Sequence, residues 1–553
     1  MSDSFEWLDY IVVVGYLAIS LGLGFAFRKQ SSRDEFFTAG KSMGRLTVGL
    51  SVMATLFSAN SFVMYPSTAY GDSLRIAMAL VAFWMMGPIV IWVFIPVYSK
   101  LNCGTAYEYL ERRFHVSVRC LASALFIILR ISWMAAATYA ASVAIAGISG
   151  LNQYAVIIGL GVIAIAYTML GGLRAVMWTD VLQFFVFFGT ILFAAGLLIS
   201  QSEGGATGMV ETYFADRDHL LMDFSLDPTL RFGTIAILLG TFLEGLSAFG
   251  ADQVAVQRYI AARDMKTSQT GFVINLLGMM FVVPGLLVIG MGLFSYFHQN
   301  PTELTPVLIE KVQSDNSEQA IAIREQFTDS GEELSAVMTA HYREHPRELH
   351  ADIVAMKLND QALAQFVRTK FPAGVIGLLV AALMAATMSS IDSGVHSVTT
   401  ALVVDFRDRL KPQWKPKTEA GEMRTARALV VIVGALSIVL ACYVGQLGDV
   451  FAVAKKSVGA FAAPLLAVFV LGLFVPRATS FGVFCGAWIG AALTLGLTSW
   501  LSDWFSMWLF PLGFFSSVGI ALVLSAIPIG RGMDSGGKPL TFWAVRAQEP
   551  NDN

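Results

Sequence analysis

Charged residues are scarce in this sequence: Asp, Glu, Lys and Arg make up 14% of the 553 residues, against about 25% in a soluble domain. Together with 56% hydrophobic residues, this scarcity argues against a series of soluble domains and favours a polytopic membrane protein. The formal net charge of −3 says little by itself, because the charges are unevenly placed along the chain. We expect no nucleic-acid partner.

Cysteine is also rare. The four cysteines (Cys103, Cys120, Cys442 and Cys485) lack the paired spacing of a metal site and lie mostly in or beside apolar runs, so they imply neither a disulfide framework nor zinc. The acidic start, Met1 to Asp9, lacks the basic residues of a signal peptide. We therefore expect residues 8–27 to be a retained first span.

Apolar runs of spanning length are frequent. They predict thirteen spans, at about 8–27, 46–70, 76–98, 119–148, 152–170, 178–200, 232–251, 270–296, 372–404, 425–445, 456–475, 480–500 and 508–528. Lys and Arg concentrate in residues 28–45, 99–119, 252–268 and 405–427, which fall on one side under this count, whereas residues 201–231 are acidic. Basic loops face the cytoplasm, so we expect the N-terminus outside and the C-terminus inside.

A soluble-looking insert at 298–371 interrupts the apolar pattern. It predicts short amphipathic helices, for example around Glu318–Phe327 and Asp360–Lys370. Under the predicted topology it lies outside. A lid, a cap or simple decoration would all fit, and we favour decoration, because long exposed insertions are tolerated at little cost.

The most unusual stretch runs from Phe371 to Asp405, where a membrane helix carries a polar cluster at mid-membrane depth. Ser389, Asp392 and Ser393 stand at i, i+3 and i+4, so they share one helix face, and Ala386, Ser389 and Ser390 repeat the pattern. Hydroxyl and carboxylate oxygens are hard ligands, and the cluster favours an ion site. The alternative is that the serines bond back to carbonyls four residues earlier while Asp392 marks the helix end.

Two other spans contain residues that disrupt helices. The second holds a run of small and polar residues before Pro66, and the seventh holds Gly240, Gly245 and Gly250 together with Glu244. Interrupted helices at matching places in two halves point to inverted repeats with a binding site at the midplane. The halves would be residues 46–200 and 232–475.

Several motifs resemble the signatures of the sodium/solute symporter family. They are Gly171–Gln183 (GGLRAVMWTDVLQ), Asp252–Ala262 (DQVAVQRYIAA), Phe371–Gly374 (FPAG), Ser389–Ser393 (SSIDS) and Gly459–Phe474. The resemblance implies an all-α LeuT-type fold with two inverted repeats of five helices. The expected division is an extra N-terminal helix and loop (1–45), a first repeat (46–201), an external loop (202–231), a second repeat (232–475, with the insert) and extra C-terminal helices with a cytoplasmic tail (476–553).

The resemblance also assigns sodium ligands. The main site would use the carbonyls of Ala54, Phe57 and Ala386 and the hydroxyls of Ser389 and Ser390. A second site, for sodium or a proton, would use Asp180 with Ser389, Asp392 and Ser393. This chain departs from members that carry a hydroxyl or small residue at the Asp392 position, which puts the second sodium in doubt. Asp180 as a structural cap is the alternative.

The same resemblance points to a solute site on the broken helix and its neighbours. An Arg at the position of Arg130 resembles a carboxylate clamp, because guanidinium offers a carboxylate two parallel donors; a structural pair with an acid such as Glu244 is the alternative. Lys456 lies near the position that faces the solute in the family; the alternative is that its side chain extends to the outer interface. Leu56, Phe83, Ala248 and Met279 are apolar where sugar-carrying members are polar. The expected solute-binding residues are Thr55, Phe57, Ser58, Ser61, Phe83, Arg130, Trp133, Glu244, Phe249 and Lys456.

The resulting hypothesis is sodium-driven symport of a small anionic organic solute, sialic-acid-like or monocarboxylate-like, by alternating access. Such a protein would be a non-enzymatic monomer in the bacterial inner membrane. The alternatives are a sodium-coupled sugar or proline-like symporter, a transporter-like sensor, and a channel. An intramembrane hydrolase is disfavoured, because His396 and Asp392 stand at i and i+4 without a GxSxG or HExxH motif.

Overall fold

A computed structural model describes residues 5–30, 32–215, 222–327, 333–447, 450–501, 503–527, 529 and 539–547. Part of the predicted external loop and most of the C-terminal tail lie outside these residues. The described part is helical. The helices are α1 (Trp7–Ala26), α2 (Arg33–Thr38), α3 (Arg45–Leu56), α4 (Ala59–Gly71), α5 (Met78–Ile89), α6 (Ile95–Lys100), α7 (Glu108–Arg113), α8 (Val116–Ser149), α9 (Gln153–Gln201), α10 (Gly205–Ala215), α11 (Thr234–Leu246), α12 (Gln253–Ala261), α13 (Met265–Gln299), α14 (Thr305–Ser314), α15 (Glu318–Phe327), α16 (Leu334–Glu344), α17 (Pro346–Ala355), α18 (Asn359–Lys370), α19 (Val375–Ala401), α20 (Asp408–Leu410), α21 (Glu419–Val444), α22 (Val450–Ser457), α23 (Ala463–Phe474), α24 (Ser480–Trp500), α25 (Leu509–Leu524) and α26 (Phe542–Ala547).

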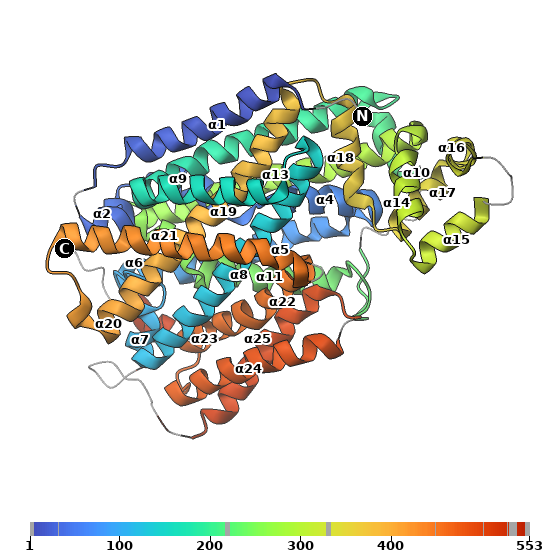
Figure 1. Ribbon diagram of the computed structural model, residues 1–553. Coiled ribbons are helices and arrows are strands. Elements are labelled where there is room, and N and C mark those ends of the chain that lie inside the picture. The colour runs from blue at the N-terminus through green and yellow to red at the C-terminus, as the bar shows by residue number, and fades with distance from the viewer. Residues whose placement is uncertain are drawn as a thin grey trace.

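The long helices form a single bundle, with α1 at one edge and α24 at the opposite edge (Figure 1). Among the described residues, 11 helices are long and apolar enough to cross a membrane, and the bent pair α3/α4 raises the number to 12. Many large apolar side chains on their outer faces are exposed, for example Trp92 and Phe281, as expected for surfaces that contact lipid. The protein is therefore a multi-pass membrane protein.

Helix α9 is too long for one crossing. Its 49 residues would extend about 73 Å if straight, more than twice the hydrocarbon thickness of a bilayer. It bends at Gly172, whose φ of 54° and ψ of −155° are not helical. Arg368 of α18 donates to the carbonyl of Gly147, shortly before α9 begins. Near the other end of α9, the ring of Phe193 packs on that of Phe371, with the ring centroids 5.5 Å apart. Both ends of α9 thus lie near α18, so the helix turns back at Gly172. This is compatible with the thirteen spans, whose number and sidedness stay predictions.

Two spans are broken, as predicted. Helices α3 and α4 meet at a 65° bend around Phe57, and α11 gives way to α12 at Asp252, where the backbone is extended. The second break lies just beyond the predicted glycines. A broken helix frees backbone carbonyls from their intrahelical partners, and both breaks lie against the cavities described below.

Helix α19 lies at the centre of the bundle, and almost all of its residues are buried. It packs against α9, α8, α1 and α3. Its start is fixed by Asp9 of α1, whose Oδ1 accepts from the backbone N–H groups of Gly374 at 2.8 Å and Gly377 at 2.6 Å. A carboxylate at a helix N-terminus satisfies free N–H groups and complements the helix dipole. The peripheral first helix therefore anchors the central one.

The insert is helical, and α15 and α18 match the two amphipathic segments predicted there. Helices α14 to α17 extend beyond one end of the bundle, whereas α18 packs along α4 (Figure 1). His350 of α17 also contacts the carbonyl of Tyr70 at 2.9 Å. The insert is therefore joined to α4, the second half of the broken helix, a contact that simple decoration does not require.

Candidate functional site

A cavity of about 180 Å³ opens beside the break between α3 and α4. Eight of the ten predicted solute-binding residues line it: Thr55, Phe57, Ser58, Ser61, Phe83, Arg130, Trp133 and Glu244. Asn60, Thr241 and Ser247 add further polar groups to its wall. The side chain of Leu56 lies outside the described part of the structure.

Two acid–base pairs line this cavity. Arg130 of α8 donates through Nε to Asp252 Oδ2 at 3.0 Å and through Nη2 to the same oxygen at 2.5 Å. Asp252 Oδ1 accepts from the backbone N–H of Val254 at 2.8 Å and so caps α12. Arg130 therefore has a partner acid, as the alternative prediction held, but that acid is Asp252 and not Glu244. Asp252 belongs to one of the family-like motifs, but its place at the helix break could not be read from the sequence.

Glu244 pairs instead with Lys455 of α22, whose Nζ lies 3.1 Å from Oε2. Lys455 lines the cavity, whereas the predicted Lys456 is exposed and does not. The prediction missed by one residue because neighbouring positions on a helix point about 100° apart. Phe249 also lies away from the cavity: it is buried and packs on Phe272 at 5.2 Å. Lys456 and Phe249 are therefore removed from the candidate site.

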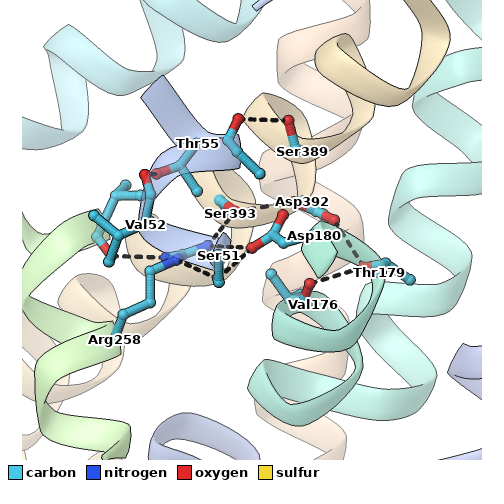
Figure 2. Close-up of polar contacts among 12 residues, drawn as sticks. Ser51, Val52, Thr55, Val176, Thr179, Asp180, Arg258, Ser389, Asp392 and Ser393 are labelled. Carbon is cyan, nitrogen blue, oxygen red and sulfur yellow. Dashed lines mark hydrogen bonds and ion pairs between the residues drawn. The ribbon is translucent and has the colours of Figure 1, made fainter. Parts of the chain in front are cut away.

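A second, smaller cavity, of about 10 Å³, lies between the end of α3 and the middle of α19. Ser389 Oγ lies 3.0 Å from the carbonyl oxygen of Ala54 and 3.0 Å from that of Ala386, and Ser390 Oγ lies 3.3 Å from the Ala386 carbonyl. Figure 2 shows Ser389 facing the end of α3. Four of the five predicted sodium ligands are thus brought together, and Phe57, the fifth, lines the same cavity.

The predicted second ion site contains an arginine. Asp180 Oδ2 accepts from Arg258 Nη2 at 3.0 Å and from Ser51 Oγ at 2.5 Å, and Arg258 Nη2 also contacts Ser393 Oγ (Figure 2). Arg258 was counted as a loop charge in the sequence, but its side chain is fully buried. Asp180 is therefore paired with a permanent cation, and its Oδ1 has no partner among the described residues. A second cation there stays a prediction.

Asp392, the departure from the family pattern, is held by neutral donors. Its Oδ2 accepts from Tyr167 at 2.5 Å and Thr179 at 3.4 Å, and its Oδ1 accepts from Ser393 at 3.0 Å. All these groups are buried. Tyr167 was not predicted, because an aromatic residue in an apolar span gives no sign of which way its hydroxyl points. Asp392 and Ser389 are one helical turn apart, so a carboxyl group lies close to the small cavity.

His396 has a structural role. Its Nε2 lies 3.0 Å from the carbonyl oxygen of Phe36, and its Nδ1 lies 3.2 Å from Gln257 Nε2. Asp392 is engaged with other partners, so no His–Asp pair exists between the two residues. Within the described residues, no group of three or more His, Cys, Asp or Glu side chains could hold a metal ion. The polar atoms around the small cavity include the carbonyl oxygens of Ala54 and Ala386 and the hydroxyl of Ser389, neutral oxygens of the kind that bind alkali ions.

Comparison with known proteins agrees with this geometry. The model of the sodium:solute symporter family matches residues 36–324 and 335–490. A sodium/sialic acid symporter of Aliivibrio fischeri, NanT, is 30% identical over 495 residues, covering 87% of this chain and 85% of that protein. The human sodium-coupled monocarboxylate transporter 1 is 26% identical, over 86% and 71% of the two chains.

Among solved structures, a substrate-bound, outward-open sodium-coupled sialic acid symporter superposes with a TM-score of 0.79. It is 26% identical and covers 95% of this chain and 98% of its own. The fold is thus of the LeuT type, and the protein is a sodium-coupled transporter, not an enzyme, that spans the plasma membrane (the inner membrane of bacteria) many times. The chain belongs to the sodium:solute symporter family.

Proposed function

We propose that this protein imports a small, hydroxylated organic carboxylate of the sialic-acid type together with sodium. The observation that carries the proposal is the position of Phe57, which lines both the large cavity containing Arg130 and the small cavity at Ser389. Solute and ion would therefore share a wall at the break of one helix. Binding at one site changes the conformational equilibrium that the other experiences.

Sodium would bind first. The carbonyls of Ala54 and Phe57 at the end of α3, with the Ala386 carbonyl and the hydroxyls of Ser389 and Ser390 on α19, would surround it with oxygens. Because these groups belong to different helices, the ion would hold α3 against α19 and fix the break beside the solute cavity. The solute would then bind, and closure of the outer side would precede opening of the inner side.

Arg130 would bind the solute carboxylate. Asp252 contacts Nε and Nη2 of the guanidinium and is itself fixed at the start of α12, so Nη1 would be the donor for the solute. Asp252 therefore acts as a positioning residue. Ser58, Asn60 and Ser61, at the start of α4, offer hydroxyl and amide groups to the same cavity, which suits a polyhydroxylated acid better than a purely apolar one.

A second candidate solute is an amino acid, the proline-like alternative. The observation that favours it is the carboxylate of Glu244 in the same cavity, because a zwitterion could place its ammonium group against Glu244 and its carboxylate against Arg130. Both proposed sites are built from one chain, so we also propose that the monomer is the functional unit, with its C-terminus in the cytoplasm.

The test is uptake into proteoliposomes with and without an inward sodium gradient. The panel would contain radiolabelled sialic acid, pyruvate, proline and glucose. We expect sodium-dependent accumulation of the hydroxylated acid above equilibrium, which also distinguishes a symporter from a channel. Accumulation of proline alone would favour the second candidate, and equilibration without accumulation would contradict symport.

Two variants assign the sites. Ser389→Ala combined with Ser390→Ala removes two hydroxyl ligands and should raise the sodium concentration for half-maximal uptake at least about tenfold. Arg130→Ala should abolish uptake of the acid while sodium binding persists. Unchanged sodium dependence in the first variant, or retained affinity for the acid in the second, would contradict the assigned role. Lys456→Ala, at an exposed position outside the cavity, is the control that should behave like the wild type.

A further inference from the structure

A groove of about 630 Å³ lies between α6 and the C-terminal helix α26, and it shares no lining residue with the two cavities described above. One wall comes from the membrane span that ends at Lys100 and includes α6. This wall is formed by Trp92, Val93, Pro96, Val97 and Lys100. Residues three or four positions apart share a helix face, so one side of a span carries an apolar strip that ends in a cation.

Helix α26 forms the other wall of the groove. Phe542 and Val545 are buried, whereas Arg546 is exposed, and all three line the groove. The ring of Phe542 lies near that of Phe474 of α23, with the centroids 6.1 Å apart. Lys100 Nζ donates to the backbone carbonyl of Arg546 at 3.0 Å. The two cationic residues of the groove, one from each wall, are therefore in direct contact at the end of the span.

The position of the groove matches the boundary between water and lipid. Lys100 is the last residue of its span, and Trp92 lies two turns earlier, about 12 Å along the helix. The side chain of Trp92 is 66% exposed. Tryptophan is enriched at membrane interfaces, and the groove therefore extends from the interface into the layer of acyl chains. Under the predicted topology, this end of the span faces the cytoplasm.

The chemistry of the lining selects among possible occupants. Among the described lining residues, both charged side chains are cationic and all the others are apolar. A small soluble anion would leave the apolar strip uncovered, and a zwitterionic lipid would bring a further cation to the same end. A phospholipid with a negatively charged headgroup complements both parts of the groove, and basic pockets on the cytoplasmic side of spans are known to suit such headgroups. The volume also lies within the range of about 300–1,000 Å³ of small-molecule sites.

We propose that this groove binds an anionic glycerophospholipid. Its phosphate would lie at Lys100 and Arg546, and an acyl chain would lie along the strip from Trp92 to Val97. Because the two walls belong to α6 and α26, the lipid would hold the C-terminal helix against the bundle. The proposal depends on neither the solute site nor the sodium site.

The test measures the unfolding temperature of the purified protein in a neutral detergent on titration with phosphatidylglycerol or with phosphatidylcholine. Phosphatidylglycerol should stabilise the wild type more strongly, and native mass spectrometry should detect it on the protein. Lys100→Gln combined with Arg546→Gln should raise the phosphatidylglycerol concentration for half-maximal stabilisation at least about fivefold, because the phosphate loses both cations. Trp92→Ala keeps both charges but removes part of the apolar wall, and should raise this concentration about threefold. Equal stabilisation of the wild type by the two lipids would overturn the proposal.

A matched double variant separates the groove from a general attraction of anionic lipid to basic surface. Arg28→Gln combined with Lys29→Gln removes two exposed cations just after α1, another span that ends on the same predicted side. This variant should leave the half-maximal phosphatidylglycerol concentration within about twofold of the wild type. Equal effects of the two double variants would overturn the proposal. If the double variant in the groove does not fold, Arg546→Gln alone, at an exposed position, takes its place and is compared with Arg28→Gln.

A headgroup fragment shows which part of the lipid is recognised. Glycerol 3-phosphate carries the phosphate without acyl chains, and it should not stabilise the protein at concentrations at which phosphatidylglycerol has its full effect. Equal stabilisation by the fragment and by the lipid would mean that the groove binds a soluble anion, which would overturn its assignment to a lipid. Stabilisation by phosphatidylglycerol alone, weakened in both the charge variant and Trp92→Ala, supports the proposal.

Discussion

Arg258 lies 3.0 Å from Asp180, and neither side chain exposes any surface. The pair joins α12 to α9, and Ser51 of α3 bonds to both members. A buried carboxylate without a counter-charge would be strongly destabilising, whereas a paired one is tolerated. The position predicted for a second sodium ion or proton therefore already holds a positive charge, that of the Arg258 side chain.

Removing one partner of this pair should destabilise the fold. Arg258→Met leaves the Asp180 carboxylate buried and unpaired, at a cost of about 3–5 kcal/mol. For a chain of this length that corresponds to a fall of about 3–4 °C in the unfolding temperature, measured from tryptophan fluorescence in detergent.

The double variant is the control. Arg258→Met combined with Asp180→Leu removes both charges and should recover most of the lost stability, because two apolar groups need no partner. A double variant less stable than Arg258→Met would show that the two residues act separately.

Asp252 should matter for the solute and not for sodium. Asp252→Asn keeps an oxygen to cap α12 but loses the charge that holds Arg130 in place. We expect the solute concentration for half-maximal uptake to rise about tenfold or more. The sodium concentration that gives half of the maximal rise in unfolding temperature, measured without solute, should change less than twofold. An equal shift in both quantities would mean that the substitution disturbs the broken helices as a whole.

The adjacent lysines Lys455 and Lys456 offer a matched comparison. Lys455 forms an ion pair with Glu244 in the wall of the cavity, and Lys456 is exposed. Lys455→Gln should change solute affinity at least about fivefold, because Glu244 would lose its partner inside the cavity. Lys456→Gln should leave uptake unchanged. The comparison is made by solute titration in proteoliposomes, and equal effects of the two variants would exclude a specific role for Lys455.

The sequence revealed those parts of the site that depend on strong local signals. The run from Ser389 to Ser393 is a polar cluster in an otherwise apolar helix, and the small residues before Pro66 mark a helix that must break. The pairing of Ala54 with Ser389 came from the family resemblance and not from these signals, and the structure places the two residues 3.0 Å apart across more than 300 residues.

Residues whose role depends on direction could not be predicted. Arg258 and Arg119 read as loop charges because they flank apolar runs, yet both are buried and paired with Asp180 and Asp405, respectively. Hydropathy shows where along the chain a charged residue lies, but it does not show which face of the helix carries the side chain or which group the side chain contacts.

Asp9 gives a prediction about stability that is independent of transport. Its carboxylate is fully buried and accepts from two N–H groups at the start of α19, so loss of the charge should loosen the central helix from α1. Hydrogen bonds to a charged group are worth about 1.5–3 kcal/mol, so Asp9→Ala should lower the unfolding temperature by about 2 °C or more. The Asp9→Asn variant should unfold at a temperature between those of the wild type and Asp9→Ala.

Asp227 provides a matched control, because it also accepts a backbone N–H, that of Thr229, but is exposed. Asp227→Ala should leave the unfolding temperature unchanged, since water can replace the lost acceptor. If the two alanine variants unfold at the same temperature, the contact of Asp9 with α19 does not stabilise the bundle.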